Sequence, residues 1–363
     1  MSEPLFLVGE STSNQNLFYK TRFLAGDPFL YVESGEKSTL LVPAMEVGRA
    51  RKESRVEDVR AFNDLGYREL YRECGDSRRA LTQVAVRLLQ EYGVRHVRVE
   101  PTLPLQFADT LRSEGIEPAI DAHMIVDERR RKSGDEVAAI EAAQGSTERA
   151  LARAITLIEG SEEHAGTLHF NGIPLTSERI RAEIETALLR ENLVSEVEPT
   201  VAGGASAADP HARGHGALRW GEAIVMDIFP RSRSSRYFAD ITRTVVKGNP
   251  SETIRAMYET VMEAHATALS LVRPGANGAD IHRAVLDVFR GAGYDGNPDR
   301  PSMPHGTGHG LGLDIHEAPR LREIDVELLK DGASRSNPAC TTLTSVGSVS
   351  RTRSWSQEAG IET

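Results

Sequence analysis

Two aspartates, Asp227 and Asp240, are the acidic residues best placed to do chemistry in the second half of the chain. Asp227 lies in the apolar run Ala223–Ile228, which is typical of a buried strand, and Asp240 lies in a second strand-like segment, Tyr237–Val246. If these segments form a hairpin, the carboxylates face each other, and like charges a few ångströms apart repel unless a cation neutralises them. A second interpretation is equally open from these residues alone: Asp240 caps a turn, and Asp227 pairs with an arginine such as Arg231.

A glycine-rich segment from Pro304 to Glu317 adds three histidines, which are His305, His309 and His316. Glycine lets the backbone approach a ligand closely, and imidazole supplies neutral nitrogen ligands and exchanges protons near neutral pH. One histidine alone is more often structural, but three at this density favour a functional site. A fourth, His211, lies shortly before the Asp227 strand. The other histidines are interpreted as structural or surface residues: His96, His123, His164, His169, His215, His265 and His282.

The segments before these motifs indicate two domains. Up to about Val126, strand-like runs alternate with helical patterns, as in a small α/β domain. The strands are expected at Thr39–Val42 and His96–Val99, with a helix over Ala80–Leu89. The charged run Asp127–Gly134 is expected to be the domain boundary or a solvated turn that enters a helix. Helical patterns then cover Asp135–Ile158, Ser177–Leu193 with Ser177 as N-cap, Glu252–Val272 and Ala279–Ala292.

The composition narrows the class of protein. A chain of 363 residues that is 39% hydrophobic and 26% charged predicts a globular protein of two domains. The formal net charge of −10 argues against a nucleic-acid partner, which needs a basic face. Two cysteines, Cys74 and Cys340, cannot form a disulfide framework or a thiolate metal site. Without a long apolar run or a secretory signal at Met1–Glu10, no membrane partner is expected, and the cytoplasm is the expected location.

Three motifs, taken in order, resemble the pita-bread metallopeptidases, a family that includes methionine aminopeptidase, aminopeptidase P and prolidase. The motifs are Met226-Asp227-Ile228, Asp240-Ile241-Thr242-Arg243-Thr244 and the segment from His305 to Glu317. The interval between the two aspartates is slightly longer than is usual in the family, which we interpret as a longer hairpin. The N-terminal α/β domain resembles the extra domain of the aminopeptidase P, prolidase and creatinase branch and disfavours a methionine aminopeptidase.

The resemblance implies a role for each motif residue. Asp227 would chelate one metal ion, Asp240 would bridge two, and His309 would be the imidazole ligand. His316 and His211 would assist catalysis and contact substrate, and His305 would line the substrate side. The cofactor would be two divalent ions, manganese, cobalt or zinc, and the partner a peptide or dipeptide substrate. The resemblance also allows a homodimer.

Two glutamate ligands that the family places in EPGLY-like and R-x-E-D-like strands are missing. After Gly332, where the first strand should begin, the chain turns to a Ser-, Thr- and Arg-rich stretch without strand periodicity. A disordered tail would explain it.

A shifted reading frame explains it more specifically. Lysine occurs only six times within a Lys+Arg total of 43, which indicates a GC-rich gene. Back-translation of the chain from Ala333 with GC-rich codons, read from the third base, gives V-A-V-E-P-G-L-Y-D-P-D-V-G-G-V-R-L-E-D-A-V-V. Both motifs then appear in order, with their glutamates opposite Asn337 and Arg351. A frameshift, in the gene or in its sequencing, is therefore predicted after Gly332.

These observations predict an α/β N-terminal domain (residues 1–126), an α+β pita-bread domain (127–332) and an out-of-frame tail (333–363). The predicted function is metal-dependent removal of an N-terminal residue before proline, or cleavage of Xaa-Pro dipeptides, with this chain inactive for want of two ligands. One alternative is a creatinase-like hydrolase that uses the fold without metal. The other is a non-catalytic scaffold that binds peptides.

Overall fold

The structure is a computed structural model that describes residues 3–209, 211–294, 303, 305–324, 328 and 341–342. Contacts within the chain divide it into two compact units, unit 1 from Met1 to Asp127 and unit 2 from Glu128 to Thr363. The division falls in the charged run that was predicted as a boundary. Of the predicted tail, only Thr341–Thr342 are described, so the positions opposite the two missing glutamates lie outside the described residues.

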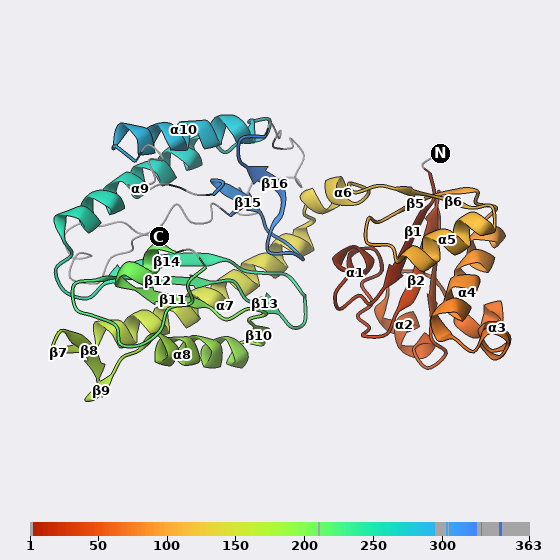
Figure 1. Cartoon of the computed structure of the whole chain (residues 1–363), viewed down its shortest axis with the longest axis horizontal. Coiled ribbons are helices and arrows are strands. Elements are labelled where there is room, and N and C mark those ends of the chain that lie inside the picture. Colours follow the sequence, from red (N-terminus) through yellow and green to blue (C-terminus); the bar gives the residue numbers. More distant parts are fainter. Residues whose placement is uncertain are drawn as a thin grey trace. The chain divides into compact units, whose positions relative to one another are not determined.

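Unit 1 is built on a mixed six-stranded sheet in the order β4-β3-β2-β1-β5-β6 (Figure 1). β1 is antiparallel to β2 and β2 to β3, whereas the outer pairs β3–β4, β1–β5 and β5–β6 are parallel. The strands are β1 (Leu5–Gly9), β2 (Phe29–Ser34), β3 (Lys37–Val42), β4 (Asp58–Ala61), β5 (His96–Val99) and β6 (Glu117–Ile120). The helices are α1 (Gln15–Thr21), α2 (Val47–Glu53), α3 (Tyr67–Cys74), α4 (Ser77–Glu91) and α5 (Leu105–Ser113).

The central strands of this sheet are buried on both faces. Four consecutive residues of β2, Phe29–Val32, are almost fully buried, which is the pattern of a strand covered by helices on both sides. The predicted strands Thr39–Val42 and His96–Val99 are β3 and β5, and the predicted helix over Ala80–Leu89 lies within α4.

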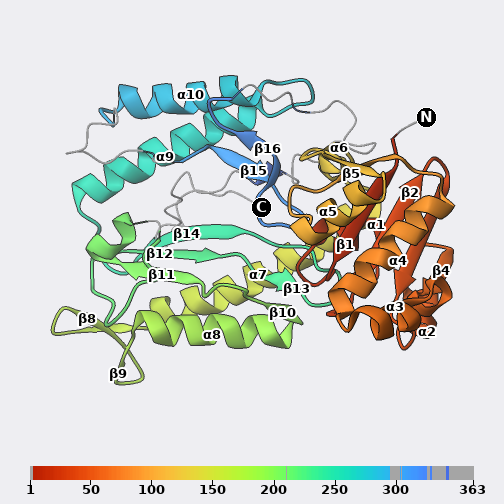
Figure 2. The same ribbon diagram turned by 45° about the vertical axis from the view of Figure 1, so that its right-hand side comes forward.

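Unit 2 begins with two long helices that lie side by side along an antiparallel sheet, β11-β12-β14 (Figure 2). The helices are α7 (Gly134–Glu159) and α8 (Ser177–Arg190), and the strands are β11 (Thr200–Gly203), β12 (Ala223–Ile228) and β14 (Ile241–Val246). Apolar side chains of α7, α8 and the sheet form one core cluster. Short strands complete this part: β7 (Glu162–His164), β8 (Thr167–Phe170), β9 (Ile173–Pro174), β10 (Leu193–Val194) and β13 (Arg231–Ser232).

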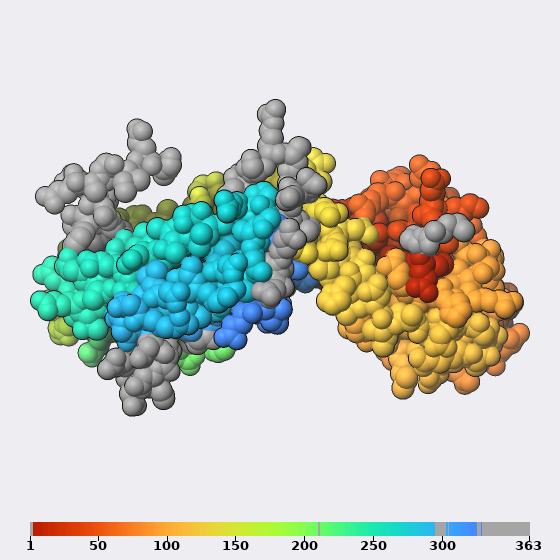
Figure 3. All heavy atoms as spheres, turned by 90° about the horizontal axis from the view of Figure 1, so that it is seen from above, coloured from red at the N-terminus to blue at the C-terminus, as the bar shows by residue number. Residues whose placement is uncertain are grey.

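A second layer of unit 2 carries the glycine- and histidine-rich motif. The helices α9 (Glu252–Leu271) and α10 (Gly278–Gly291) form a face of unit 2 (Figure 3). Their apolar side chains cluster with Leu321 of β16. The strands of this layer follow the order β16-β15-β17, with β15 (Gly308–Gly310), β16 (Glu317–Leu321) and β17 (Thr341–Thr342).

Three predicted boundaries were wrong. The helix predicted over Ser177–Leu193 ends at Arg190, and Leu193 belongs to β10. The N-cap of α8 is Thr176, whose side chain accepts a hydrogen bond from the Arg179 amide, and not Ser177. The second strand begins at Ile241 and not at Tyr237, because the preceding amides donate elsewhere. The Phe238 amide donates to the Gly312 carbonyl, and the Asp240 amide donates to the Gln144 side chain.

Across the described residues, no helix is both long and apolar enough to cross a membrane.

The segment that leads from His211 into β12 is held against β11 by a glycine. Gly214 has a left-handed backbone (φ 76°), and a Cβ there would lie 1.8 Å from the Val201 carbonyl oxygen. Gly216 has the same φ, but no atom lies within 4 Å of its Cβ position. We expect Gly216→Ala to cost roughly 1 kcal/mol in unfolding free energy, from the left-handed backbone alone. Gly214→Ala should cost about 3 kcal/mol or more, because β11 must also move.

Urea unfolding of the full chain, followed by circular dichroism, measures both values. Equal losses in the two variants would show that the close approach of Gly214 to β11 does not constrain the fold.

Candidate active site

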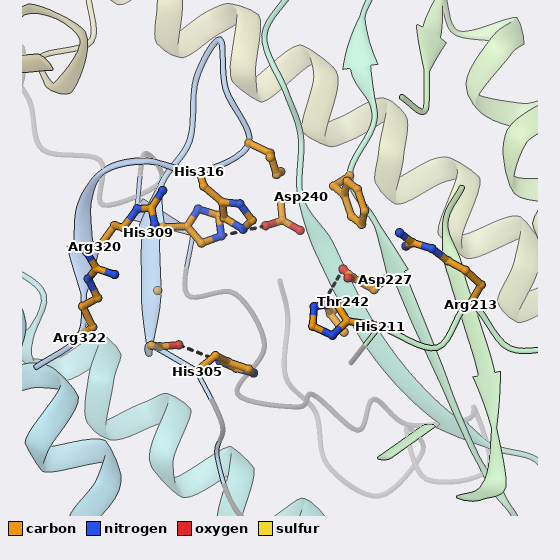
Figure 4. A pocket seen from close by; sticks show the side chains of 14 residues that line it. His211, Arg213, Asp227, Asp240, Thr242, His305, His309, His316, Arg320 and Arg322 are labelled. Carbon is orange, nitrogen blue, oxygen red and sulfur yellow. Dashed lines mark hydrogen bonds and ion pairs between the residues drawn. The ribbon is translucent and has the colours of Figure 1, made fainter. Parts of the chain in front are cut away.

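The predicted site residues of unit 2 line one cavity of about 420 Å³ (Figure 4). Two walls contribute. One comes from β12, β14 and the segment before β12, and the other comes from β15, β16 and the segments beside them. The lining residues are His211, Arg213, Asp227, Phe229, Asp240, Thr242, His305, Gly306, Gly308, His309, Ile315, His316, Arg320 and Arg322. All six residues predicted from the motifs are among them.

Strand pairing brings the two aspartates to the same wall. Asp227 of β12 pairs with Thr242 of β14, and Asp240, which directly precedes β14, lines the same cavity. The Thr242 hydroxyl donates a hydrogen bond of 2.7 Å to Asp227 Oδ1. Burial raises the pKa of Asp227, and the Thr242 hydrogen bond and the charge of Arg213 offset part of that rise.

Asp240 is the more deeply buried of the two carboxyl groups. Burial first, and then the negative charge of Asp227, raise its pKa well above the ordinary value. The alternative in which Asp227 pairs with Arg231 is wrong: Arg231 forms an ion pair with Glu196, and its guanidinium lies 5.4 Å from the centre of the Phe238 ring. Asp240 directly precedes β14 and does not cap a turn.

His309 presents a bare ring nitrogen to Asp240. Its Nδ1 lies 3.0 Å from the Gly310 carbonyl oxygen, which can only accept, so Nδ1 carries the proton and Nε2 has a free lone pair. Nε2 is buried, lies 3.5 Å from Asp240 Oδ2 and has no hydrogen-bond partner among the residues that the structure describes. Burial lowers the pKa of His309 to about 4, so the ring is neutral near pH 7. A neutral, buried imidazole nitrogen opposite a carboxylate is the donor arrangement of a metal ligand.

The other three histidines lie around this pair. The His316 ring meets the His309 ring edge-on, with centroids 4.3 Å apart, and burial followed by the charge of Arg320 lowers the pKa of His316. His305 precedes β15, and its Nδ1 contacts the Gly306 carbonyl oxygen at 2.9 Å. The His211 amide donates to Asp209 Oδ1, which fixes the backbone at the cavity wall.

The motif glycines serve close packing of the chain on itself more than the approach of a ligand. A Cβ on Gly310 would lie 2.4 Å from the Ala318 carbonyl oxygen, and one on Gly312 would lie 2.5 Å from Glu317 Oε2. Only glycine therefore lets β15 and the following loop lie so close to β16. Gly306 and Gly308 line the cavity, and for them the approach of a ligand to the backbone stays a prediction.

Several cavity residues were missed by the sequence interpretation. Thr242 could have been found, because strand alternation from Asp240 places it beside Asp227. Arg213, Arg320 and Arg322 had no such signal, since each stands in a segment with other charged or polar residues. Among the histidines interpreted as structural, His282 contacts Thr307 Oγ1 at 2.8 Å and so supports the histidine motif from α10.

The described residues supply some of the ligands of a cation site, but not a complete set. Asp240 and His309 meet as a carboxylate and a neutral imidazole, whereas the described residues contain no group of three or more possible ligands close enough to hold an ion. In unit 2 the remaining donors would have to come from outside the described residues, where the two missing glutamates were expected.

Two family matches together cover most of the chain. Residues 138–344 match metallopeptidase family M24, and residues 11–131 match the creatinase/prolidase N-terminal domain. In sequence, the chain is 27% identical over 326 residues to a Xaa-Pro dipeptidase of Pyrococcus horikoshii, covering 88% of this chain and 81% of the relative.

Solved structures share the fold over nearly the whole chain. The X-Pro aminopeptidase of Thermotoga maritima superposes with a TM-score of 0.72 at 21% identity, covering 90% of this chain and 85% of that one. The prolidase of Pyrococcus horikoshii superposes with a TM-score of 0.70 at 24% identity, covering 91% and 84%. The predicted fold class, an α/β N-terminal domain followed by an α+β pita-bread domain, is confirmed. Because the family match spans more than half of its length, this chain belongs to metallopeptidase family M24.

Proposed function

We propose that this protein descends from metal-dependent peptidases that cleave Xaa-Pro bonds at the N-terminus of peptides, either as an aminopeptidase or as a dipeptidase. The observation that carries the proposal is the unpartnered Nε2 of His309, which faces Asp240 in a cavity shared with Asp227 and three more histidines. Relatives and structural neighbours described as Xaa-Pro dipeptidases and an X-Pro aminopeptidase support the substrate class.

In this proposal Asp227, Asp240 and His309 are metal ligands. When bound, two divalent ions supply Lewis acidity and lower the pKa of a water molecule. The rise in pKa that burial gives Asp227 and Asp240 agrees with this role, because a cation would stabilise the charged carboxylates in the same buried place. Manganese, cobalt and zinc all suit such a donor set.

His316, His211 and His305 are proposed to contact the peptide. The lowered pKa of His316 leaves its ring neutral near pH 7, so that it can accept a hydrogen bond or a proton from the reacting groups. His211 and His305 stand on different walls of the cavity, and a peptide between them would be held from two sides.

The chain in its present reading frame is proposed to lack two metal ligands. In the shifted frame the two glutamates of the family align with Asn337 and Arg351 of this sequence. A second candidate function is peptide binding without turnover, which would follow if the two glutamate ligands are missing. It is favoured by a cavity that keeps four histidines and three arginines beside only two carboxylates. A creatinase-like reaction without metal is disfavoured by the combination of Asp227, Asp240 and His309.

We expect the frame-restored chain, in which the shifted reading replaces the residues after Gly332, to hydrolyse Xaa-Pro peptides only with a divalent metal. The reason is that the proposed reaction requires the ions that Asp227, Asp240 and His309 would hold. Activity on a panel of dipeptides and longer peptides, after chelation and after metal add-back, tests this. Full activity in the stripped protein would refute the proposed metal dependence.

His309→Ala and His316→Ala should separate the two roles in the frame-restored chain. His309→Ala removes a ligand and should lower the bound metal. His316→Ala should keep the metal and lower kcat by about 10² to 10⁴-fold, the usual range for a lost proton-transfer group. Elemental analysis beside kcat measures both, and equal metal loss in the two variants would contradict the assignment.

The chain as written should bind metal poorly and show little or no peptidase activity beside the frame-restored chain. Its site lacks two anionic ligands, so positive charge in a buried place would stay uncompensated. Metal stoichiometry and peptidase rate, measured on both chains in parallel, provide the comparison. If the written chain holds two ions and turns over peptide equally fast, the proposed ligand set is wrong.

A further inference from the structure

A cluster of charges, buried except for the half-exposed Asp314, lies beside the histidine motif but outside the proposed ligand set. Its members are Arg129 and Lys132, near the start of unit 2, and Glu317 and Asp314, next to His316 in the chain. The Lys132 and Glu317 side chains are only 5% and 6% exposed, and Arg129 is 12% exposed. Within the charged run Asp127–Gly134, Lys132 is therefore buried and Arg129 is partly buried, whereas most of the other residues of the run are exposed, as expected for a solvated turn.

Each Glu317 oxygen has its own cation. Lys132 Nζ donates to Oε2 at 2.9 Å, and Arg129 Nη2 donates to Oε1. Burial alone would raise the pKa of Glu317, but Lys132 and Arg129 outweigh burial and hold that pKa below its ordinary value. Arg129 Nη2 also reaches Asp314 Oδ2 at 2.6 Å, and Lys132 Nζ donates to the Arg129 carbonyl oxygen.

Buried ion pairs of this kind are poor sources of stability. Removing two charges from water costs several kcal/mol per ion, and apolar residues of similar size are often equally stable or more so. Such a pair can instead fix the position of a side chain, because a carboxylate that accepts hydrogen bonds from two cations is held in one orientation.

The same carboxylate organises the loop between β15 and β16. The Asp314 amide donates to Glu317 Oε1 at 3.1 Å, and Glu317 packs where a side chain of Gly312 would stand. The Gly312 carbonyl in turn accepts the Phe238 amide, close to Asp240 in the chain. His316, which ends this loop, meets His309 edge-on at a centroid distance of 4.3 Å.

We propose that Lys132 and Arg129, acting through Glu317, are positioning residues that hold the loop Leu311–His316 so that the His316 ring stands against His309 in the cavity. None of the three lines the cavity, so they act on the site only through the loop. The importance of this positioning for catalysis rests on the proposed function, whereas the positioning itself does not.

Lys132→Met and Glu317→Gln in the full chain as written test the proposal without metal or peptide. Two readouts report on the loop: the ¹⁵N and ¹³C ring signals of His309 and His316, assigned by single substitution, and hydrogen–deuterium exchange over residues 311–317. Both variants should shift or broaden the two ring signals and raise loop exchange by on the order of tenfold, as expected for a lost charge-assisted hydrogen bond. Exchange in β12 and β14 should stay unchanged.

Two further variants control for charge and for a general loss of an ion pair. Lys132→Arg keeps a cation and should restore most of the native signals. Arg149→Met removes an exposed ion pair with Glu191 in the same unit and should leave the loop unchanged. Native ring signals and loop exchange in Lys132→Met would overturn the proposal.

A double variant, Lys132→Met with Glu317→Met, separates positioning from stability. It removes Lys132 and Glu317 together and leaves Arg129 its ion pair with Asp314, so unit 2 should unfold at a urea concentration close to that of the unmodified chain. Under the proposal its His316 signal stays perturbed and its loop exchange stays high. A native loop in this double variant would refute the proposal. Loss of the whole fold in every variant would also refute it, because the ion pairs would then stabilise the whole unit and not the loop in particular. Failure to bind metal or cleave peptide changes none of these readouts, so it would count against the proposed function alone.

Discussion

The burial of carboxylates is the constraint on which the architecture of unit 2 depends. Three of them, Asp227, Asp240 and Glu317, lie within or beside the histidine-lined cavity, and a buried charge is costly unless it is compensated. Glu317 is compensated from within the chain by Lys132 and Arg129, and its pKa is lowered. Asp240 has a raised pKa, and the side chain that lies against it is the neutral imidazole of His309, with Nε2 at 3.5 Å. The contrast agrees with the proposal that Asp227 and Asp240 are ligands of a cation, whereas Glu317 is compensated within the chain.

The backbone around the cavity follows from the same requirement. Antiparallel pairing of β12 with β14 is what places Asp227 and Asp240 on one wall. The opposite wall needs β15 and its loop to lie close to β16, and Gly310 and Gly312 permit this because a Cβ at either position would overlap β16 atoms. Gly312 thus serves both the packing of the loop on β16 and the burial of Glu317, because the carboxylate of Glu317 fills the space beside Gly312. The proposed ligand His309, the proposed substrate residue His316 and the ion-pair cluster of Glu317 therefore lie within a few consecutive residues.

Membership of metallopeptidase family M24 explains why this arrangement is present, although the described residues bring together no group of three possible metal ligands. Strand pairing, glycine packing and the Glu317 cluster all depend on residues before Gly332, which the predicted frameshift would leave unaltered. The cavity can therefore form from the described residues whether or not the chain supplies the two further ligands that the family resemblance implies. Fold and activity are then separable properties of the chain, because the fold draws on the whole core and the activity on a few donors.

The sequence by itself determined several elements and a set of candidate site residues. Strand β12, the long helices and the candidates Asp227, Asp240, His309 and His316 followed from period and residue type, which are local properties of the chain. Only the tertiary structure decided what those residues contact. The charged run at Arg129 and Lys132 looked solvated, because its partner Glu317 lies far along the chain and no local pattern connects them. Arg231 likewise looked available to Asp227 and is paired with Glu196. Burial and long-range pairing, which set the charge and the tautomer of each side chain, depend on neighbours that sequence order does not reveal.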